Sequence, residues 1–122
     1  MSESERTILI CDDEQSLREL VRAILANGYR FVDAKDGDEA LELARSFRPD
    51  LMIIDIMLPR RSGLEVVTEV RRDALLHSTP VVVVTAWSHA EQSALTAGAD
   101  GFLEKPFDPE ELQRLVDELL AA

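Results

Sequence analysis

The chain has 122 residues, of which 46% are hydrophobic and 30% charged; this is ordinary for one globular domain and long enough to bury a core without disulfides. The net charge of −11 argues against direct binding to nucleic acid, which needs a basic surface, and suits a cation or a basic partner. One cysteine excludes an internal disulfide, and residues 1–6 lack the apolar core of a signal peptide, so we expect no membrane contact and a cytoplasmic location.

The predicted strands are short apolar runs, at residues 8–11, 31–32, 51–54, 81–84 and 101–104. Three of them, at 8–11, 51–54 and 81–84, do not alternate with polar residues. Continuous runs of this kind are typical of parallel strands that helices cover on both faces. The run at 101–104 contains few residues that favour strands and is predicted mainly from its place in the pattern.

Apolar residues recur at helical spacing between the strands and after the last one. The stripes run over residues 17–25, 40–47, 64–70 and 112–120. Asp108 and Pro109 are typical of the cap and first position of a helix. The alternation predicts an α/β fold with five βα units, in which helices cover both faces of a five-stranded parallel sheet. We expect one domain over residues 1–122, with its core at about 6–121.

Polar residues follow four of the five predicted strands. The first strand leads into Asp12 and Asp13, the third into Asp55, the fourth into Thr85 and the fifth into Lys105. Ligands of open α/β sheets bind just beyond the carboxyl ends of the strands, so these side chains are expected to share one crevice.

Three carboxylates in one crevice repel one another, and burial raises their pKa values unless a cation compensates. The cation could be Lys105 or Mg²⁺, which prefers one or two carboxylates, water and phosphate oxygens. The crowding predicts that Asp55→Asn raises the melting temperature without metal. An ionised Asp beside such cations can attack phosphorus, and the Thr85 hydroxyl could bind the transferred phosphoryl group.

These residues stand in a set of motifs that resembles the bacterial response-regulator receiver domain. The matching segments are ILICDDE at 8–14, PDLMIIDIMLP at 49–59 with Gly63, TA at 85–86 and GADGFLEKPF at 98–107. The resemblance implies a flavodoxin-like sheet with strand order 2-1-3-4-5. It also implies a phosphorylation-activated signalling switch in a two-component phosphorelay. The stretch from Thr85 to Lys105 is slightly short for the family and predicts a short fourth helix or leading loop.

The resemblance also implies a role for each site residue. Asp55 is the phosphoacceptor, Lys105 contacts the phosphoryl group, and the bond from Lys105 to Pro106 is cis. Thr85 and Phe102 respond to phosphorylation as the switch. Mg²⁺ is held by Asp12, Asp13, Asp55 and the backbone carbonyl of Met57.

The implied partners come from the same resemblance. A phosphohistidine on a sensor histidine kinase or a histidine phosphotransfer protein donates the phosphoryl group. A downstream partner binds the face formed by the fourth helix, the strand at 101–104 and the helix at 112–120. Met57 and Trp87 occupy the positions that admit water to the acyl phosphate, and both are too bulky and apolar to orient it.

Two other functions remain open from the sequence. One is a Mg²⁺-dependent hydrolase that forms an aspartyl phosphate, but its nucleophile would normally follow the first strand and a cap region would cover its substrate. The other is an interaction domain that works without phosphorylation, against which the intact set of site residues argues. We expect no enzyme activity beyond the chain's own phosphorylation and dephosphorylation.

Overall fold

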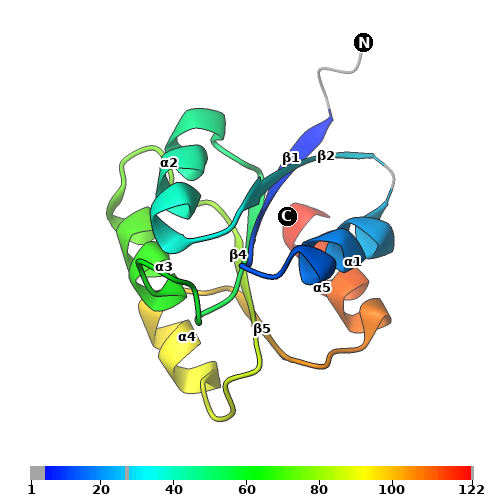
Figure 1. Ribbon diagram of the computed structural model, residues 1–122. Coiled ribbons are helices and arrows are strands. Elements are labelled where there is room, and N and C mark those ends of the chain that lie inside the picture. The colour runs from blue at the N-terminus through cyan, green and yellow to red at the C-terminus, as the bar shows by residue number, and fades with distance from the viewer. Residues whose placement is uncertain (1–4, 27, 122) are drawn as a thin grey trace.

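Five parallel strands form one sheet in the order β2-β1-β3-β4-β5 in the computed structural model, which describes residues 5–26 and 28–121 (Figure 1). The strands are β1 (Arg6–Cys11), β2 (Tyr29–Ala34), β3 (Leu51–Ile54), β4 (Val81–Thr85) and β5 (Gly101–Glu104). The predicted fold class and strand order are confirmed. β2 is longer than predicted, because it pairs with β1 along its whole length.

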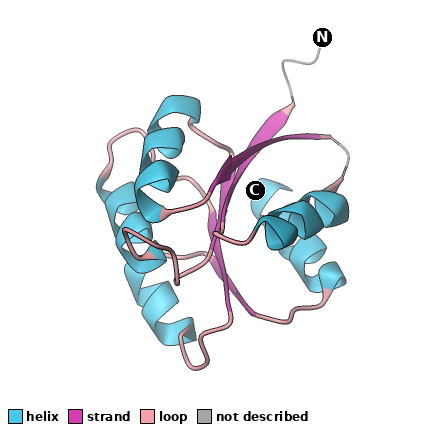
Figure 2. Ribbon diagram, viewed as in Figure 1, coloured by secondary structure: helices cyan, strands magenta, loops and turns pink. Residues whose placement is uncertain are grey.

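Five helices alternate with the strands and form two outer layers. The helices are α1 (Gln15–Leu25), α2 (Gly37–Phe47), α3 (Gly63–Arg72), α4 (Glu91–Ala97) and α5 (Pro109–Ala121). Figures 1 and 2 show α1 and α5 on one side of the sheet and α2, α3 and α4 on the other. Within residues 5–26 and 28–121, no helix is long and apolar enough to cross a membrane.

The buried parts of the central strands, such as residues 8–11 of β1, are apolar because each face of the sheet contributes to a separate core. Ile8 and Ile10 of β1 pack in the cluster beneath α1 and α5. Leu9 and Cys11, the alternate residues, pack in the cluster beneath α2, α3 and α4. Successive strand side chains point to opposite faces, so a strand covered on both sides has no solvent-facing position to fill with a polar residue.

Polar caps fix where several helices begin. Asp108 accepts a hydrogen bond at 2.9 Å from the backbone N–H of Glu110, so α5 begins where the sequence predicts. Ser62 and Glu65 cap α3 reciprocally, each side chain accepting from the backbone at that end of the helix. The fourth helix, α4, has seven residues and no side-chain cap, in agreement with the predicted short element.

Arg71, near the end of α3, connects three elements through its guanidinium group. Its Nε donates to the Gly98 carbonyl at 2.9 Å and its Nη1 to the Thr79 carbonyl at 2.7 Å. Its Nη2 pairs with Asp100 Oδ2 at 2.7 Å, and the same oxygen accepts from the Val81 N–H at 2.8 Å. One side chain therefore ties the ends of α3 and α4 to the start of β4.

We expect Arg71→Met to lower the free energy of unfolding by roughly 2–4 kcal/mol, because several charge-assisted hydrogen bonds to backbone carbonyls are lost. Urea denaturation measures the change. Arg72→Met is the matched control, because the ion pair that Arg72 makes among the described residues is an exposed one, with Glu69 at 3.9 Å. The loss of stability in this variant is expected to stay within about 0.5 kcal/mol. Equal losses in the two variants would contradict the connecting role of Arg71.

Candidate functional site

The register of the sheet brings Asp12 and Asp55 side by side. Cys11, the last residue of β1, is paired with Ile54, the last residue of β3. The ladder continues one step further, because the Asp55 N–H donates to the Cys11 carbonyl at 3.0 Å. Asp12 is 3% exposed and Asp55 is 6% exposed, so two carboxylates from neighbouring strands lie buried at one edge.

Lys105 reaches both carboxylates from the end of the edge strand β5. Thr85 pairs with Glu104 at the ends of β4 and β5, and the Lys105 N–H then donates to the Thr85 carbonyl at 2.8 Å. The Lys105 Nζ lies 2.9 Å from Asp12 Oδ2 and 2.9 Å from Asp55 Oδ2. The bond from Lys105 to Pro106 is cis, as the family resemblance implies. A single ammonium group therefore bridges the ends of β1 and β3.

The remaining polar atoms of the site bind the backbone. Asp12 Oδ1 accepts from the Glu14 N–H, and Asp55 Oδ1 from the Met57 N–H, each at 2.9 Å. The buried Thr85 hydroxyl accepts from the Trp87 N–H at 3.3 Å. In the part of the chain that the structure describes, no buried side-chain nitrogen or oxygen lacks a partner. The site is preorganised by its own loops.

The two buried acids differ in their ionisation. Burial raises the pKa of Asp12, and the hydrogen bonds from Glu14 and Lys105 do not compensate fully. Burial also acts to raise the pKa of Asp55, but hydrogen bonds from Lys105, the Met57 N–H and the Thr85 hydroxyl outweigh it, so that this pKa is lowered. The pKa of Lys105 is raised, because its two carboxylate partners outweigh its own burial. The surroundings of Asp55 thus favour its ionised form, whereas those of Asp12 favour its neutral form.

The other predicted site residues lie around this centre. Asp13 is exposed, and so is the Met57 side chain. Phe102, on β5, is half-buried and packs against the core beneath α2, α3 and α4. Among residues 5–26 and 28–121, no three Asp, Glu, His or Cys side chains come together as a metal-binding group. The structure therefore gathers Asp12, Asp55, Thr85 and Lys105 and leaves Asp13 at the rim.

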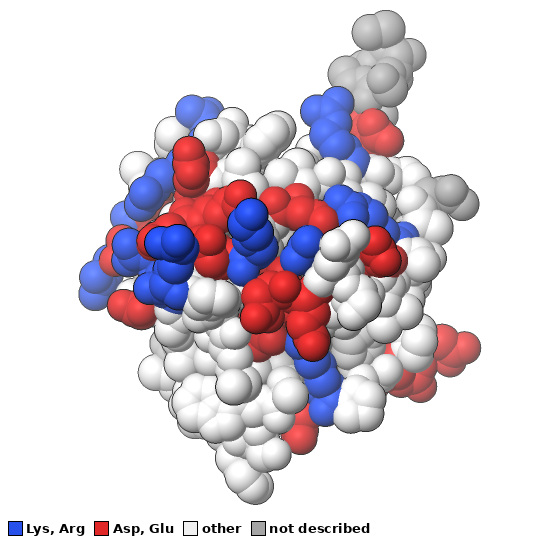
Figure 3. All heavy atoms as spheres, in the orientation of Figure 1, with Lys and Arg blue, Asp and Glu red and all other residues white. Residues whose placement is uncertain are grey.

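The chemistry of these donors nevertheless fits Mg²⁺. This ion usually keeps several waters and needs only one or two protein carboxylates, which Asp12 and Asp55 supply. Figure 3 shows acidic side chains gathered across the middle of the face seen in Figure 1, with basic groups among them. The area over α4 in that view is mostly uncharged. An acidic surface of this kind raises the local concentration of cations.

Gly63, which the motif comparison includes without a stated role, is needed at the site because of how closely α3 approaches β3. A Cβ atom at Gly63 would lie 2.1 Å from the Asp55 carbonyl oxygen and 2.8 Å from the Ile56 Cα. Only glycine allows the first turn of α3 to approach the backbone behind Asp55 this closely. The Gly63 N–H also donates to the Ile56 carbonyl at 2.8 Å, which fixes the loop that follows β3.

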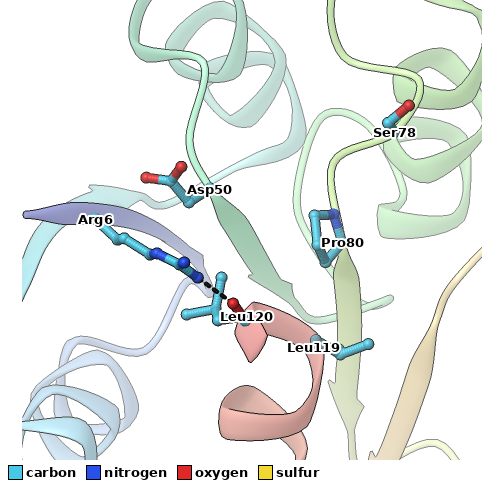
Figure 4. Close-up of a pocket in the computed structure, with 6 residues that line it drawn as sticks. All are labelled: Arg6, Asp50, Ser78, Pro80, Leu119 and Leu120. Atoms are coloured by element: carbon cyan, nitrogen blue, oxygen red, sulfur yellow. Dashed lines mark hydrogen bonds between the residues drawn. The ribbon is translucent and has the colours of Figure 1, made fainter. Parts of the chain in front are cut away.

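A separate hollow lies at the opposite, amino-terminal ends of the strands (Figure 4). It has a volume of about 320 Å³ and is lined by Arg6, Asp50, Ser78, Pro80, Leu119 and Leu120. Arg6 donates to the Leu120 carbonyl, and Asp50 accepts from the Thr7 N–H. Its charged groups are therefore already paired with the backbone, and the chemically distinctive cluster lies at the other edge of the sheet.

Comparisons with known proteins agree with this geometry. The family model "Response regulator receiver domain" matches residues 8–117. Response regulator MprA of Mycolicibacterium vanbaalenii is 44% identical over 108 residues, which are 86% of this chain and 46% of that protein. The chain thus spans about half the length of the curated relatives it matches.

Two solved structures are similar over nearly the whole chain. A response regulator of Chloroflexus aurantiacus is 34% identical, with a TM-score of 0.91, and the match covers 96% of this chain and 98% of that one. The receiver domain of sensor histidine kinase PA1611 from Pseudomonas aeruginosa is 28% identical, with a TM-score of 0.87 and coverage of 96% and 98%. The latter has a magnesium ion coordinated in its active-site cleft.

The opposite pKa directions of the two acids predict opposite effects on stability. A raised pKa means that folding disfavours the ionised form of Asp12. The contribution of Asp12 to stability therefore falls as the pH rises above the pKa of an aspartate in the unfolded chain. A lowered pKa means that ionised Asp55 adds stability, which is lost as pH falls. We therefore expect, at pH 7 in chelator, that Asp12→Asn raises the melting temperature and Asp55→Asn lowers it.

The expected fall in melting temperature for Asp55→Asn is opposite to the rise expected from crowding alone, because Lys105 and two further hydrogen bonds stabilise the Asp55 charge. Thermal unfolding followed by circular dichroism measures both shifts. A higher melting temperature for Asp55→Asn would show that repulsion among the acids outweighs the contact with Lys105.

Proposed function

This chain belongs to the response-regulator receiver family of two-component systems, and on that premise we propose that Asp55 accepts a phosphoryl group from a phosphohistidine. The observation that carries the proposal is the buried Asp55 carboxylate, whose ionised form is favoured by the Lys105 ammonium at 2.9 Å. The proposed donor is a sensor histidine kinase or a histidine phosphotransfer protein. The unit that receives the group is one receiver domain, with its core at about residues 6–121.

In the proposed transfer, a carboxylate oxygen of Asp55 attacks the phosphorus atom in line with the bond to histidine. An O–P bond forms, the P–N bond breaks, and its electron pair returns to the imidazole, which takes up a proton. Lys105 can pair with the phosphoryl oxygens because it already lies against Asp55. Positioning and charge neutralisation supply most of the rate in phosphoryl transfer.

Mg²⁺ is the proposed cofactor, held by Asp12, Asp13, Asp55 and the Met57 carbonyl; when bound, it would neutralise charge on the phosphoryl oxygens. The two buried carboxylates support this assignment. So does the magnesium ion in the cleft of the PA1611 receiver domain, a structure similar to this chain. With Mg²⁺ bound, the negative charge of Asp12 and Asp55, which Lys105 pairs with in this structure, would be shared between Lys105 and the ion.

The proposed signal is a change in the face formed by α4, β5 and α5, where a downstream partner binds. Thr85 lies at the end of β4 with its hydroxyl near Asp55, and Phe102 pairs in register with Val83 of the same strand. A phosphoryl group that engages the Thr85 hydroxyl would therefore act on the strand beside Phe102. Switches of this kind shift a two-state element through local charge and hydrogen bonding.

Two further expectations stay proposals. We propose no enzyme activity beyond the chain's own phosphorylation and dephosphorylation, because the nucleophile follows the third strand, unlike the hydrolases considered above. We also propose a cytoplasmic domain that does not itself bind nucleic acid, which its net charge of −11 supports. The longer relatives, of which the chain covers about half, can have further activities.

Asp55→Asn is expected to abolish phosphorylation by acetyl phosphate in Mg²⁺ buffer, because the amide is a poor nucleophile and keeps the shape of the site. Intact-mass spectrometry measures the uptake of one phosphoryl group. Asp50→Asn is the matched control at the opposite end of β3, where Asp50 accepts from the Thr7 N–H, and it should react like the parent. A phosphorylated Asp55→Asn protein would show that another residue is the acceptor.

A second prediction concerns the lifetime of the phosphoryl group. The backbone N–H groups of Met57 and Trp87 donate to Asp55 and Thr85, so both residues adjoin the site, and they are 61% and 48% exposed. We expect them to restrict the approach of water, so that Met57→Asn with Trp87→Glu speeds the loss of the phosphoryl group about tenfold, equivalent to ~1.4 kcal/mol. Decay of the phosphorylated mass in Mg²⁺ buffer measures this. An equal or slower decay would show that these side chains do not control water.

A further inference from the structure

Arg18, on the first turns of α1, reaches back to the backbone of Asp12. Its Nη1 donates to the Asp12 carbonyl at 2.7 Å, and its Nε pairs with Asp33 Oδ2 on β2 at 2.9 Å. The Arg18 side chain is only 14% exposed. Its planar group presents donors in two fixed directions, and here each direction has its own acceptor.

The contact completes the set of partners around Asp12. The Asp12 N–H donates to the Ala34 carbonyl at 3.0 Å. Its two carboxylate oxygens accept from the Glu14 N–H and from Lys105, each at 2.9 Å. The carbonyl lies beyond the end of β1, and Arg18 is the group that binds it. All four polar atoms of Asp12 are therefore held.

The Asp12 carbonyl also controls the residue that follows it. The carbonyl of Asp12 and the N–H of Asp13 belong to one planar peptide unit. A hydrogen bond that fixes this carbonyl therefore also fixes the orientation of the peptide plane that leads into Asp13. Arg18 acts in this way on two acids without contacting either carboxylate.

We propose that Arg18 is a positioning residue of the phosphoacceptor site, which holds the Asp12–Asp13 peptide so that both carboxylates face the incoming cation. The inference rests on the proposed function, because it assigns Mg²⁺ to these acids. Asp33 is the anchor of Arg18, and its position on β2 links the site to the edge of the sheet. Groups that orient metal ligands typically change metal affinity ten- to a hundredfold when they are removed.

Arg22 provides a control within the same cluster. Its Nη2 pairs with Asp33 Oδ1 at 2.5 Å, so Arg22→Gln and Arg18→Gln each remove one guanidinium from the same carboxylate. They also change the net charge of the chain equally. Only Arg18→Gln removes the donor to the Asp12 carbonyl. Any difference between the two variants at the site therefore reports on that hydrogen bond.

The experiment is a Mg²⁺ titration followed by the backbone amide resonances of Asp12, Asp13 and Glu14. We expect Arg18→Gln to weaken Mg²⁺ binding at least about tenfold and Arg22→Gln to leave it near the parent value. Arg18→Lys should not restore the affinity fully, because one ammonium group cannot hold Asp33 and the Asp12 carbonyl in two fixed directions. Parental affinity in Arg18→Gln, or equal losses in Arg18→Gln and Arg22→Gln, would overturn the proposal.

Amide hydrogen exchange in chelator tests the positioning independently of any metal or phosphate. The Asp12 and Glu14 N–H groups are both hydrogen-bonded, and we expect them to exchange faster in Arg18→Gln than in Arg22→Gln. If the parent neither binds Mg²⁺ nor takes up a phosphoryl group while this difference persists, the proposed function is wrong and Arg18 still positions Asp12. If the difference is absent, the positioning role is wrong even where the parent is phosphorylated.

Discussion

The bridge from one ammonium group to two buried carboxylates is the constraint on which the rest of the site depends. The register of β1 and β3 places Asp12 and Asp55 next to each other, and they stay adjacent as long as the two strands are paired. Two ionised carboxylates that lie side by side away from water repel each other more strongly than they would in water. The ammonium group of Lys105, at the end of β5, offsets this repulsion, because it lies 2.9 Å from each acid. The outermost strand is thereby tied to the centre of the sheet by charge.

The same ammonium lies equally far from both acids, yet the pKa of Asp12 is raised and that of Asp55 is lowered. The difference therefore comes from the surroundings of each carboxylate. Asp12 loses more to burial than its partners return, whereas Asp55 has the additional support of the Thr85 hydroxyl. Perturbed groups of opposite sense, close together, are typical of functional sites. Asp55, whose ionised form the fold favours, is the acid that the proposed chemistry needs as a nucleophile.

The fold was predictable from the sequence because its signals are local. The valine run at 81–84 and the Asp108 cap each predict their element from a few neighbouring residues. The order of the strands, in contrast, came only from the family resemblance. The meeting of Lys105 with the acids could be expected from the strand ends. The roles of Arg18 and Arg71 could not, because both bind backbone carbonyls, which every residue has and no sequence pattern marks. Those contacts depend on how helices lie against loops far away in the chain.

A phosphoryl group on Asp55 would replace one carboxylate charge with close to two negative charges at neutral pH, spread over three acceptor oxygens, in a site that now contains one ammonium. Lys105, which now bridges Asp12 and Asp55, would then divide its charge between the Asp12 carboxylate and the phosphoryl oxygens, and the excess negative charge would favour a further cation. This change would act on β5, because Lys105 is its direct continuation and its N–H is held by the Thr85 carbonyl. The proposed switch thus follows from competition for one ammonium group. Lys105 pairs with the acids at the ends of β1 and β3 and is bonded to the end of β4, so negative charge added at Asp55 would act on β4 and β5.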